Sequence, residues 1–268
     1  MIIVTYVNAP SSVIVGRLRA AGCVYAEDEA GLLTAAAKTP TDLANMVDRR
    51  VAGLPLEHIL GWAEFCGLRV LVDPGVFVPR RRTELLVRQA AAVAPPRSIV
   101  VDLCCGSGAV GAAVAARLEG AELHAVDIDP AAVRCARRNI GAMGQVYEGD
   151  LYEPLPDLLR GRVNVLVANA PYVPTEAIGL MPQEARVHET RVAQDGGVDG
   201  LDVQRRVAGG ASLWLAPHGN LLVETSRRQA PQTVEIFAQN GLIPRVLRDD
   251  DCDATVVIGK RPSIGRAR

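Results

Sequence analysis

The chain has 268 residues, 49% of them hydrophobic, and a formal net charge of −1, values typical of a globular protein with a sizeable core. The near-zero charge argues against general nucleic-acid or membrane-surface binding, and 2 Trp and 3 Phe residues provide no aromatic platform for stacked bases. There is no apolar run of membrane-spanning length, no signal-peptide pattern and no Cys-x-x-Cys pair. We therefore expect a cytoplasmic protein with reduced thiols and no metal.

Residues 1–60 are predicted to form a small helical domain. Thr39 is a good helix cap because Pro40 occupies the first helical position and Asp42 follows three residues after the cap. Apolar residues then recur at helical spacing as far as Val51. The segment carries no chemistry of its own, so we expect it to serve packing or the docking of a substrate or partner.

Residues 61–80 are expected to form a β-hairpin linker, because β-type residues stand on both sides of Gly67. A basic triplet at residues 80–82 follows. Thr83 and Glu84 then have the pattern of a helix start, and Pro95 and Pro96 stop that helix.

Residues 81–268 alternate between strand and helix patterns, which predicts a doubly wound α/β sheet with its ligand at the carboxyl ends of the strands. Strands are expected at 98–103, 121–126, 145–149, 162–168, 219–225, 243–248 and 254–259, and helices at 109–118, 130–140, 203–215 and 228–239. The acidic turn at 249–253 is too short for a crossover helix, so the last two strands should pair antiparallel. A seven-stranded, mostly parallel sheet with its last strand antiparallel is the pattern of class I S-adenosylmethionine methyltransferases. The long segment 173–202 is expected to be functional.

The turn after the first of these strands, Cys104-Cys105-Gly106-Ser107-Gly108, is a candidate cofactor loop. With Gly111, its glycines match the Gly-x-Gly-x-x-Gly spacing of dinucleotide sites, so spacing alone does not choose the ligand. Asp102 favours S-adenosyl-L-methionine, because an acid before the turn suits a cationic cofactor, directly or by holding the loop, better than a pyrophosphate.

Two further acids stand at the ends of the next two strands. Asp127, followed by Ile128, can accept both ribose hydroxyls. Asp150 can accept a hydrogen bond from the adenine amino group, while Leu151 covers the ring. Acidic residues at three successive strand ends are hard to explain by packing alone, so we interpret them as a cofactor site.

The fourth strand ends in Asn169-Ala170-Pro171-Tyr172, which we interpret as the catalytic loop. A planar nitrogen is a weak nucleophile because its lone pair is delocalised. The Asn169 side-chain oxygen and the Ala170 carbonyl could accept its two N–H groups, and Tyr172 could pack on the flat group. Pro171 would stiffen the loop. Catalysis would then come from positioning and desolvation rather than from a strong base.

Together these motifs resemble the HemK/PrmC-type protein-(glutamine-N5) methyltransferases, which modify the Gln of the Gly-Gly-Gln loop of peptide chain release factors. The resemblance covers about residues 53–260 and includes the stretches 56–61, 65–69, 73–80, 83–84, 169–172 and 189–202. It implies that Asp127, Asn169 and the turn 104–108 bind the cofactor, and that residues 169–172 hold the substrate Gln. The matching motifs add candidate substrate-binding residues, which are Phe77, Arg80, Thr83 and Glu84.

The chain departs from that family at several positions. Ala170 replaces a Pro, Cys104 and Cys105 replace Gly and Thr, and Arg81 and Arg82 replace a Pro and an acidic residue. The two arginines suggest a different or more acidic substrate.

Alternative functions remain open at this point. The same core could methylate a small-molecule amide, amine or hydroxyl. Base methylation of nucleic acid is disfavoured by the low charge and few aromatics. A non-catalytic binding role conflicts with the intact cofactor motifs.

Overall fold

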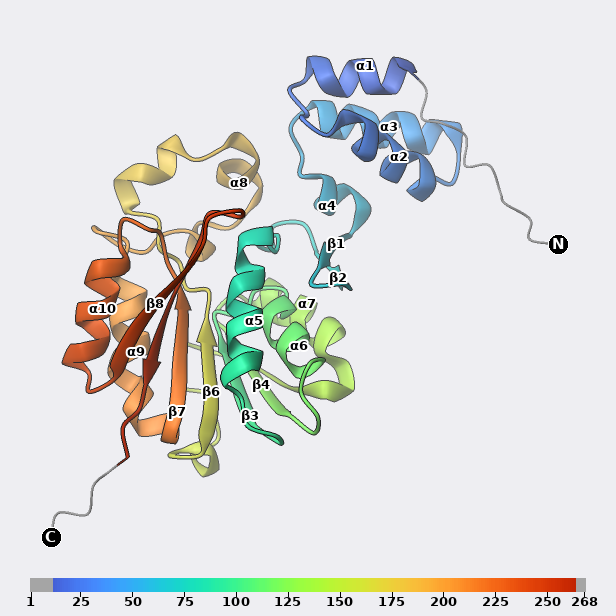
Figure 1. Ribbon diagram of the computed structural model, residues 1–268. Helices are drawn as coiled ribbons and strands as arrows, with labels where there is room; N and C mark the ends of the chain where they lie inside the picture. The colour runs from blue at the N-terminus through green and yellow to red at the C-terminus, as the bar shows by residue number, and fades with distance from the viewer. Residues whose placement is uncertain (1–11, 264–268) are drawn as a thin grey trace, which may run out of the picture.

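The computed structural model describes residues 12–263 and shows a small helical layer above an α/β domain (Figure 1). The helical layer contains α1 (Ser12–Ala20), α2 (Ala26–Ala36), α3 (Pro40–Val51) and α4 (Leu56–Leu60). Its helices enclose their own apolar cluster, in which Leu18, Ala30 and Leu33 are fully buried. The predicted start of α3 is confirmed, since the Thr39 hydroxyl accepts a hydrogen bond from the Asp42 amide at 3.1 Å.

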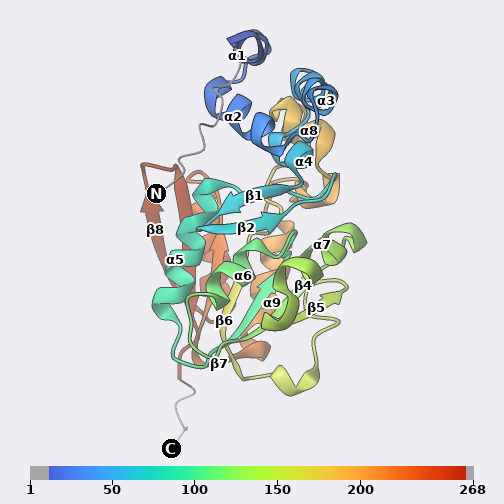
Figure 2. The ribbon, with the colours of Figure 1, turned by 90° about the vertical axis from the view of Figure 1, so that its right-hand side faces the viewer.

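A two-stranded hairpin follows the helices and packs on the α/β domain (Figure 2). Its strands β1 (Trp62–Phe65) and β2 (Leu68–Leu71) are antiparallel and are joined by two residues with positive φ, Cys66 at 55° and Gly67 at 78°. Two-residue hairpin turns of this kind match the twist of the strands they connect.

The main sheet has seven strands in the order β5-β4-β3-β6-β7-β9-β8, which confirms the predicted fold class. Five strands are parallel to their neighbours, and β9 is antiparallel to both β7 and β8. The last strand of the chain is therefore reversed, as predicted, and it lies one strand in from the edge. The strands are β3 (Ile99–Leu103), β4 (Glu122–Asp127), β5 (Gly144–Glu148), β6 (Val163–Ala168), β7 (Leu215–Glu224), β8 (Ile243–Asp249) and β9 (Ala254–Lys260).

Helices cover both faces of this sheet, and each face has its own apolar core (Figure 1). One face packs on α5 (Glu84–Val93), α6 (Ala109–Ala115) and α7 (Pro130–Ile140), and the other on α9 (Asp202–Trp214) and α10 (Ala230–Gln239). A short helix, α8 (Gln183–His188), and the 3₁₀ turns at Thr175–Leu180 and Arg191–Ala193 lie in the connection between β6 and α9. Within residues 12–263, no helix is both long and apolar enough to cross a membrane.

Because the sheet is buried on both faces, its central strands read as continuous apolar runs, and polar side chains gather where those strands end. That end of the sheet faces the helical layer (Figure 1). The Arg50 guanidinium of α3 pairs with Glu184 of α8 at 2.5 Å, and so connects the helical layer to the segment that follows β6.

Candidate active site

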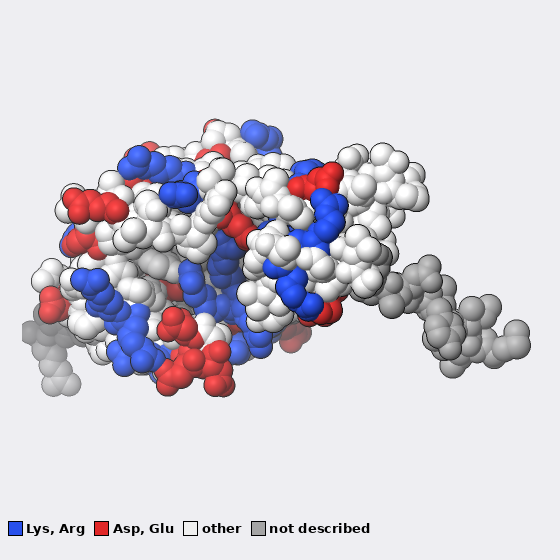
Figure 3. All heavy atoms as spheres, turned by 90° about the horizontal axis from the view of Figure 1, so that it is seen from above, with Lys and Arg blue, Asp and Glu red and all other residues white. Residues whose placement is uncertain are grey.

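A cavity of about 690 Å³ lies at the carboxyl ends of β3, β4 and β6, within the size range of small-molecule sites, about 300–1,000 Å³. Most of the residues expected from the sequence line it, namely Phe77, Thr83, Asp102, Cys104, Cys105, Gly106, Ser107, Asp127, Ile128, Asp150, Leu151, Asn169, Ala170, Pro171 and Tyr172. Three of the expected residues, Arg80, Glu84 and Gly108, are not part of its wall. Figure 3 looks down on this end of the molecule, where basic side chains gather in a hollow near the middle of the face.

The glycine turn after β3 has a backbone that few side chains tolerate. Cys104, Gly106 and Gly108 have φ of 56°, 55° and 77°, all in the left-handed region. A Cβ on Gly108 would lie 3.1 Å from both Ala136 and Ile140 of α7. Gly108 thus allows α7 to pack against the turn, which explains why it stands behind the cavity wall.

Asp127 fixes the turn from the end of β4. Its Oδ2 accepts a hydrogen bond from the Gly106 amide at 2.7 Å, and its Oδ1 accepts one from the Asp129 amide at 2.9 Å. Burial raises the pKa of this carboxyl, and the two amide hydrogen bonds oppose the rise. Each carboxylate oxygen keeps a second lone pair, so Asp127 can still accept from two adjacent hydroxyls.

Asp102 is fully buried at the end of β3 and turns away from solvent. Its Oδ2 accepts from the Gly111 amide in the first turn of α6 at 2.7 Å. Burial raises the pKa of Asp102 to about 7, and the neighbouring Asp127 adds to that rise. Of the two roles open to Asp102, the structure supports holding the loop, because its carboxylate is engaged by the helix that follows the turn.

Asp150 and Leu151 follow β5 at the far side of the cavity. Oδ2 of Asp150 pairs with Arg206 of α9 at 2.7 Å, which leaves Oδ1 for a ligand. Leu151 is buried with a positive φ of 50°. This part of the wall therefore combines an apolar surface with a carboxylate whose position is set by an arginine.

The two cysteines of the turn act as apolar lining. Burial raises the pKa of the Cys104 and Cys105 thiols well above their usual value, so both stay protonated. A protonated, buried thiol is neither a nucleophile nor a metal ligand. Among the residues that the structure describes, no group of three His, Cys, Asp or Glu side chains could hold a metal ion.

The loop after β6 forms the other end of the cavity. Asn169 Nδ2 donates to the Thr83 hydroxyl at 3.4 Å, and Ala170 is buried behind it. Thr83 was expected to cap α5, but its side chain makes no capping hydrogen bond, so that prediction is wrong. Its hydroxyl instead faces Asn169, and the Asn169 carbonyl oxygen is left to accept from a ligand.

Tyr172 is held by a buried carboxylate. Its hydroxyl donates to Glu224 Oε1 at 3.4 Å, and Arg82 Nε pairs with the same oxygen at 3.3 Å. The Arg82 guanidinium carbon lies 6.0 Å from the centre of the Tyr172 ring. Burial, and then the charge of Glu224, raise the pKa of Tyr172 to about 12, so its hydroxyl remains neutral.

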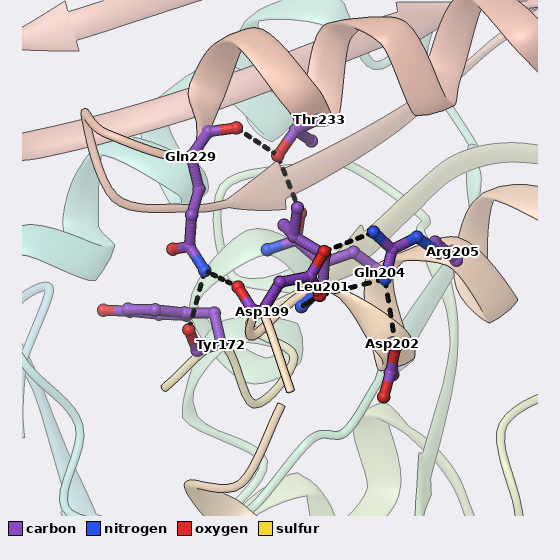
Figure 4. Close-up of polar contacts among 8 residues, drawn as sticks. All are labelled: Tyr172, Asp199, Leu201, Asp202, Gln204, Arg205, Gln229 and Thr233. Carbon is purple, nitrogen blue, oxygen red and sulfur yellow. Dashed lines mark hydrogen bonds and ion pairs between the residues drawn. The ribbon is translucent and has the colours of Figure 1, made fainter. Parts of the chain in front are cut away.

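The backbone of the same loop is anchored from α10 (Figure 4). Gln229 Nε2 donates to the Tyr172 carbonyl at 3.0 Å and to the Asp199 carbonyl at 3.1 Å. Gly200 lies against this junction, since a Cβ there would be 2.3 Å from the Tyr172 carbonyl oxygen. One buried amide therefore fastens the Asn-Ala-Pro-Tyr loop to the end of the segment 173–202.

The segment 173–202 supplies much of the cavity wall, including Val173, Thr175 and residues 190–195. Glu189, in the same segment, accepts from the Val78 amide at 3.2 Å and also pairs with Arg80. Arg80 therefore ties the chain before α5 to this segment and does not face the cavity. Glu84 begins α5 outside the wall.

Sequence reasoning missed several wall residues. The long segment 173–202 was expected to be functional, and the resemblance covered residues 189–202, but no residue between 190 and 195 was proposed as a site residue. Arg206 is an ordinary polar position on a helix, and Gln229 precedes another helix. Only their long-range contacts, with Asp150 and with the Tyr172 carbonyl, reveal that they support the site.

Comparisons with known proteins agree with this geometry. The family model for the methyltransferase small domain matches residues 67–193. A release factor glutamine methyltransferase of Geobacter sulfurreducens is 38% identical over 228 residues, which are 83% of this chain and 79% of the relative. One of Mycolicibacterium smegmatis is 39% identical over 201 residues, covering 74% of this chain and 70% of the relative.

The chain belongs to the release factor glutamine methyltransferase family. The recognition made from the sequence motifs is thereby confirmed. The fold is also shared with a solved methyltransferase of Pyrococcus furiosus, with a TM-score of 0.56 at 14% identity over 82% of this chain and 99% of that chain. The protein is a methyltransferase, and its cofactor is S-adenosylmethionine.

The residues present fit that cofactor. Asp127 offers two acceptor oxygens to a ribose, the positive-φ turn at Gly106 allows the backbone to approach a ligand, and Leu151 with Ile128 offers apolar surface to a flat ring. Ile128 lines the cavity and remains 50% exposed, so its side chain is accessible to a ligand there.

Proposed function

We propose that this methyltransferase acts on the side-chain amide nitrogen of a glutamine in a protein, the Gln of a Gly-Gly-Gln loop in a peptide chain release factor. The observation that carries the proposal is the position of the Asn-Ala-Pro-Tyr loop, residues 169–172, in the wall of the cavity that also contains the glycine turn and Asp127. The relatives named release factor glutamine methyltransferase support the same acceptor.

Residues 102–108, Asp127, Asp150 and Leu151 would hold S-adenosylmethionine, which supplies an electrophilic methyl group when bound. At the other end of the cavity, Asn169 Oδ1 and the Ala170 carbonyl would accept the two N–H groups of the acceptor amide. Those hydrogen bonds fix the nitrogen in place and favour electron density on it. Ala170 is buried, which limits the access of water to its carbonyl oxygen.

The departure at Ala170 is compatible with this role. The position contributes its backbone carbonyl, which any residue provides, and Pro171 still restricts the loop. Gln229 further holds the Tyr172 carbonyl in place. The loop is thus fixed by contacts that do not depend on a second proline.

We further propose that the helical layer, α1 to α4, docks the release factor. It stands next to α8 at the cavity end of the sheet (Figure 2), and it exposes two apolar side chains, Val24 and Tyr25, between α1 and α2. The proposed substrate would place the reaction in the cytoplasm, where translation ends.

Incubation with methyl-labelled S-adenosylmethionine and a purified release factor tests the proposal. We expect mass spectrometry to find one added methyl group on the Gln of the Gly-Gly-Gln peptide, and none on a release factor in which this Gln is replaced by Ala. If the enzyme binds the cofactor and leaves the Gln unmodified, the proposed acceptor is wrong.

A further inference from the structure

Arg82 lies at the end of the cavity that the Asn-Ala-Pro-Tyr loop forms, and a buried carboxylate holds its side chain there. It lines the cavity, its Nε pairs with Glu224, and its guanidinium lies over the Tyr172 ring. The next residue, Thr83, accepts the hydrogen bond from Asn169. Arg82 is therefore fixed beside the group that would receive the acceptor nitrogen.

The ion pair uses one edge of the guanidinium. Glu224 is 2% exposed in its side chain, and Arg82 is 45% exposed, so the carboxylate lies beneath and the arginine faces the cavity. The hydrogen bond to Glu224 uses only Nε, so N–H groups of the two Nη atoms remain for a group in the cavity that Arg82 lines. These N–H groups are hydrogen-bond donors, whereas the neighbouring Asn169 Oδ1 and Ala170 carbonyl oxygen are acceptors.

We infer that Arg82 is a specificity-determining residue, whose Nη groups donate to the carbonyl oxygen of the acceptor carboxamide. This inference rests on the proposed function. A carboxamide has an oxygen and a nitrogen of nearly equal size, so it can enter a flat slot in two orientations. Acceptors at Asn169 and Ala170 favour the nitrogen at one end, and a donor at Arg82 favours the oxygen at the other. The correct nitrogen is then presented for methylation.

The charge of the pair argues for a neutral acceptor oxygen. Glu224 balances the charge of Arg82, so the pair does not present a free cation to the substrate. A carboxylate in the slot would also stand close to the buried Glu224 carboxylate, and two like charges repel strongly at such a site. Under this inference, Arg82 does not require the more acidic substrate that the arginine pair suggested as one of two expectations from the sequence.

The test compares Arg82→Met and Arg82→Lys with Arg81→Met as a matched control. Arg81 is the adjacent arginine and does not line the cavity. The acceptor is a release factor, and the readouts are kcat/KM for methyl transfer, the dissociation constant of S-adenosylmethionine and the melting temperature. We expect R82M to lower kcat/KM roughly 10- to 150-fold, the value of a charge-assisted hydrogen bond. R82K should recover part of this loss in kcat/KM. R81M should leave kcat/KM unchanged.

A second variant distinguishes the loss of the Arg82 hydrogen-bond donor from the effect of leaving the Glu224 carboxylate without a partner. If R82M acts only by leaving Glu224 unpaired, then adding Glu224→Gln should restore activity, and that result would overturn the inference. Equal kcat/KM in R82M and the parent, or an equal loss in R81M, would also overturn it. If the parent itself binds S-adenosylmethionine and methylates no release factor, it is the proposed function that fails.

Discussion

Gln229 provides a test of how the Asn-Ala-Pro-Tyr loop, residues 169–172, is held in position. It is 8% exposed and donates both amide hydrogens, to the Tyr172 carbonyl at 3.0 Å and to the Asp199 carbonyl at 3.1 Å. Gln229→Met keeps the length of the side chain and removes both donors. Both hydrogen bonds are partly buried, and a typical one contributes about 0.5–1.5 kcal/mol, so we expect a total loss of about 1–3 kcal/mol in the free energy of unfolding.

Activity should fall as well, because the Tyr172 backbone belongs to the loop that positions the acceptor. A displacement of that loop by about 1 Å lowers kcat/KM roughly 100-fold. The affinity for S-adenosylmethionine should stay within about twofold, since Gln229 makes no hydrogen bond to the glycine turn.

Urea unfolding, methyl-transfer kinetics and cofactor titration measure these three quantities. Gln232→Met is the matched control, because Gln232 is exposed in the first turn of α10, the helix that Gln229 precedes. A surface change of this kind costs about 0.5 kcal/mol or less. Parent-like stability and kcat/KM in Q229M would refute the reasoning, as would a loss confined to cofactor binding.

Three further outcomes are expected. Asn169→Ala should lower kcat about 100- to 1,000-fold with the cofactor still bound, because it removes a hydrogen-bond acceptor for the reacting amide nitrogen. A near-parental rate in single-turnover assays would exclude the positioning mechanism. The raised pKa of Asp102, about 7 against 3.8 unfolded, means that the folded state binds the extra proton, so unfolding free energy should fall as pH rises from about 4 to 7. Asp102→Asn should flatten that slope in pH-dependent urea melts, and an unchanged slope would assign it to other groups. Arg50→Met should lower the free energy of unfolding by about 3–5 kcal/mol, because it leaves the buried Glu29 carboxylate without its partner. Glu184→Gln should lower it by under about 1 kcal/mol, because Glu184 is the more exposed partner of Arg50. Equal losses of the two variants in thermal melts would contradict this expectation.

The sequence was most informative where one strong rule sets the structure. Parallel strands end at the same edge of a sheet, so Asp127 and Asn169 could be expected at one site before any coordinates were known. The same rule placed Asp102 and Asp150 nearby. The short turn at 249–253 likewise predicted the reversed pairing of β8 and β9, which the structure confirms.

Where a side chain can bond either to a local or to a distant partner, the local sequence pattern does not decide between the two partners. Thr83 has the local pattern of a helix cap, yet its hydroxyl accepts from Asn169, 86 residues away in the chain. Arg80 matches a substrate-binding motif, yet a buried carboxylate, Glu189, takes its guanidinium. Supporting residues on helices, such as Arg206, have no local signal at all, because their role arises from packing between elements.

The place of β9 in the sheet links residues 254–260 to the substrate end of the cavity. Glu224 pairs with Val256 across the β7–β9 ladder, and Glu224 is the carboxylate behind Arg82 and Tyr172. The glycine turn and Asp127 instead follow β3 and β4, which lie on the other side of β6 in the sheet. The two ends of the cavity are therefore supported by different strands, so a change in β9 should disturb the position of a substrate more than the binding of the cofactor.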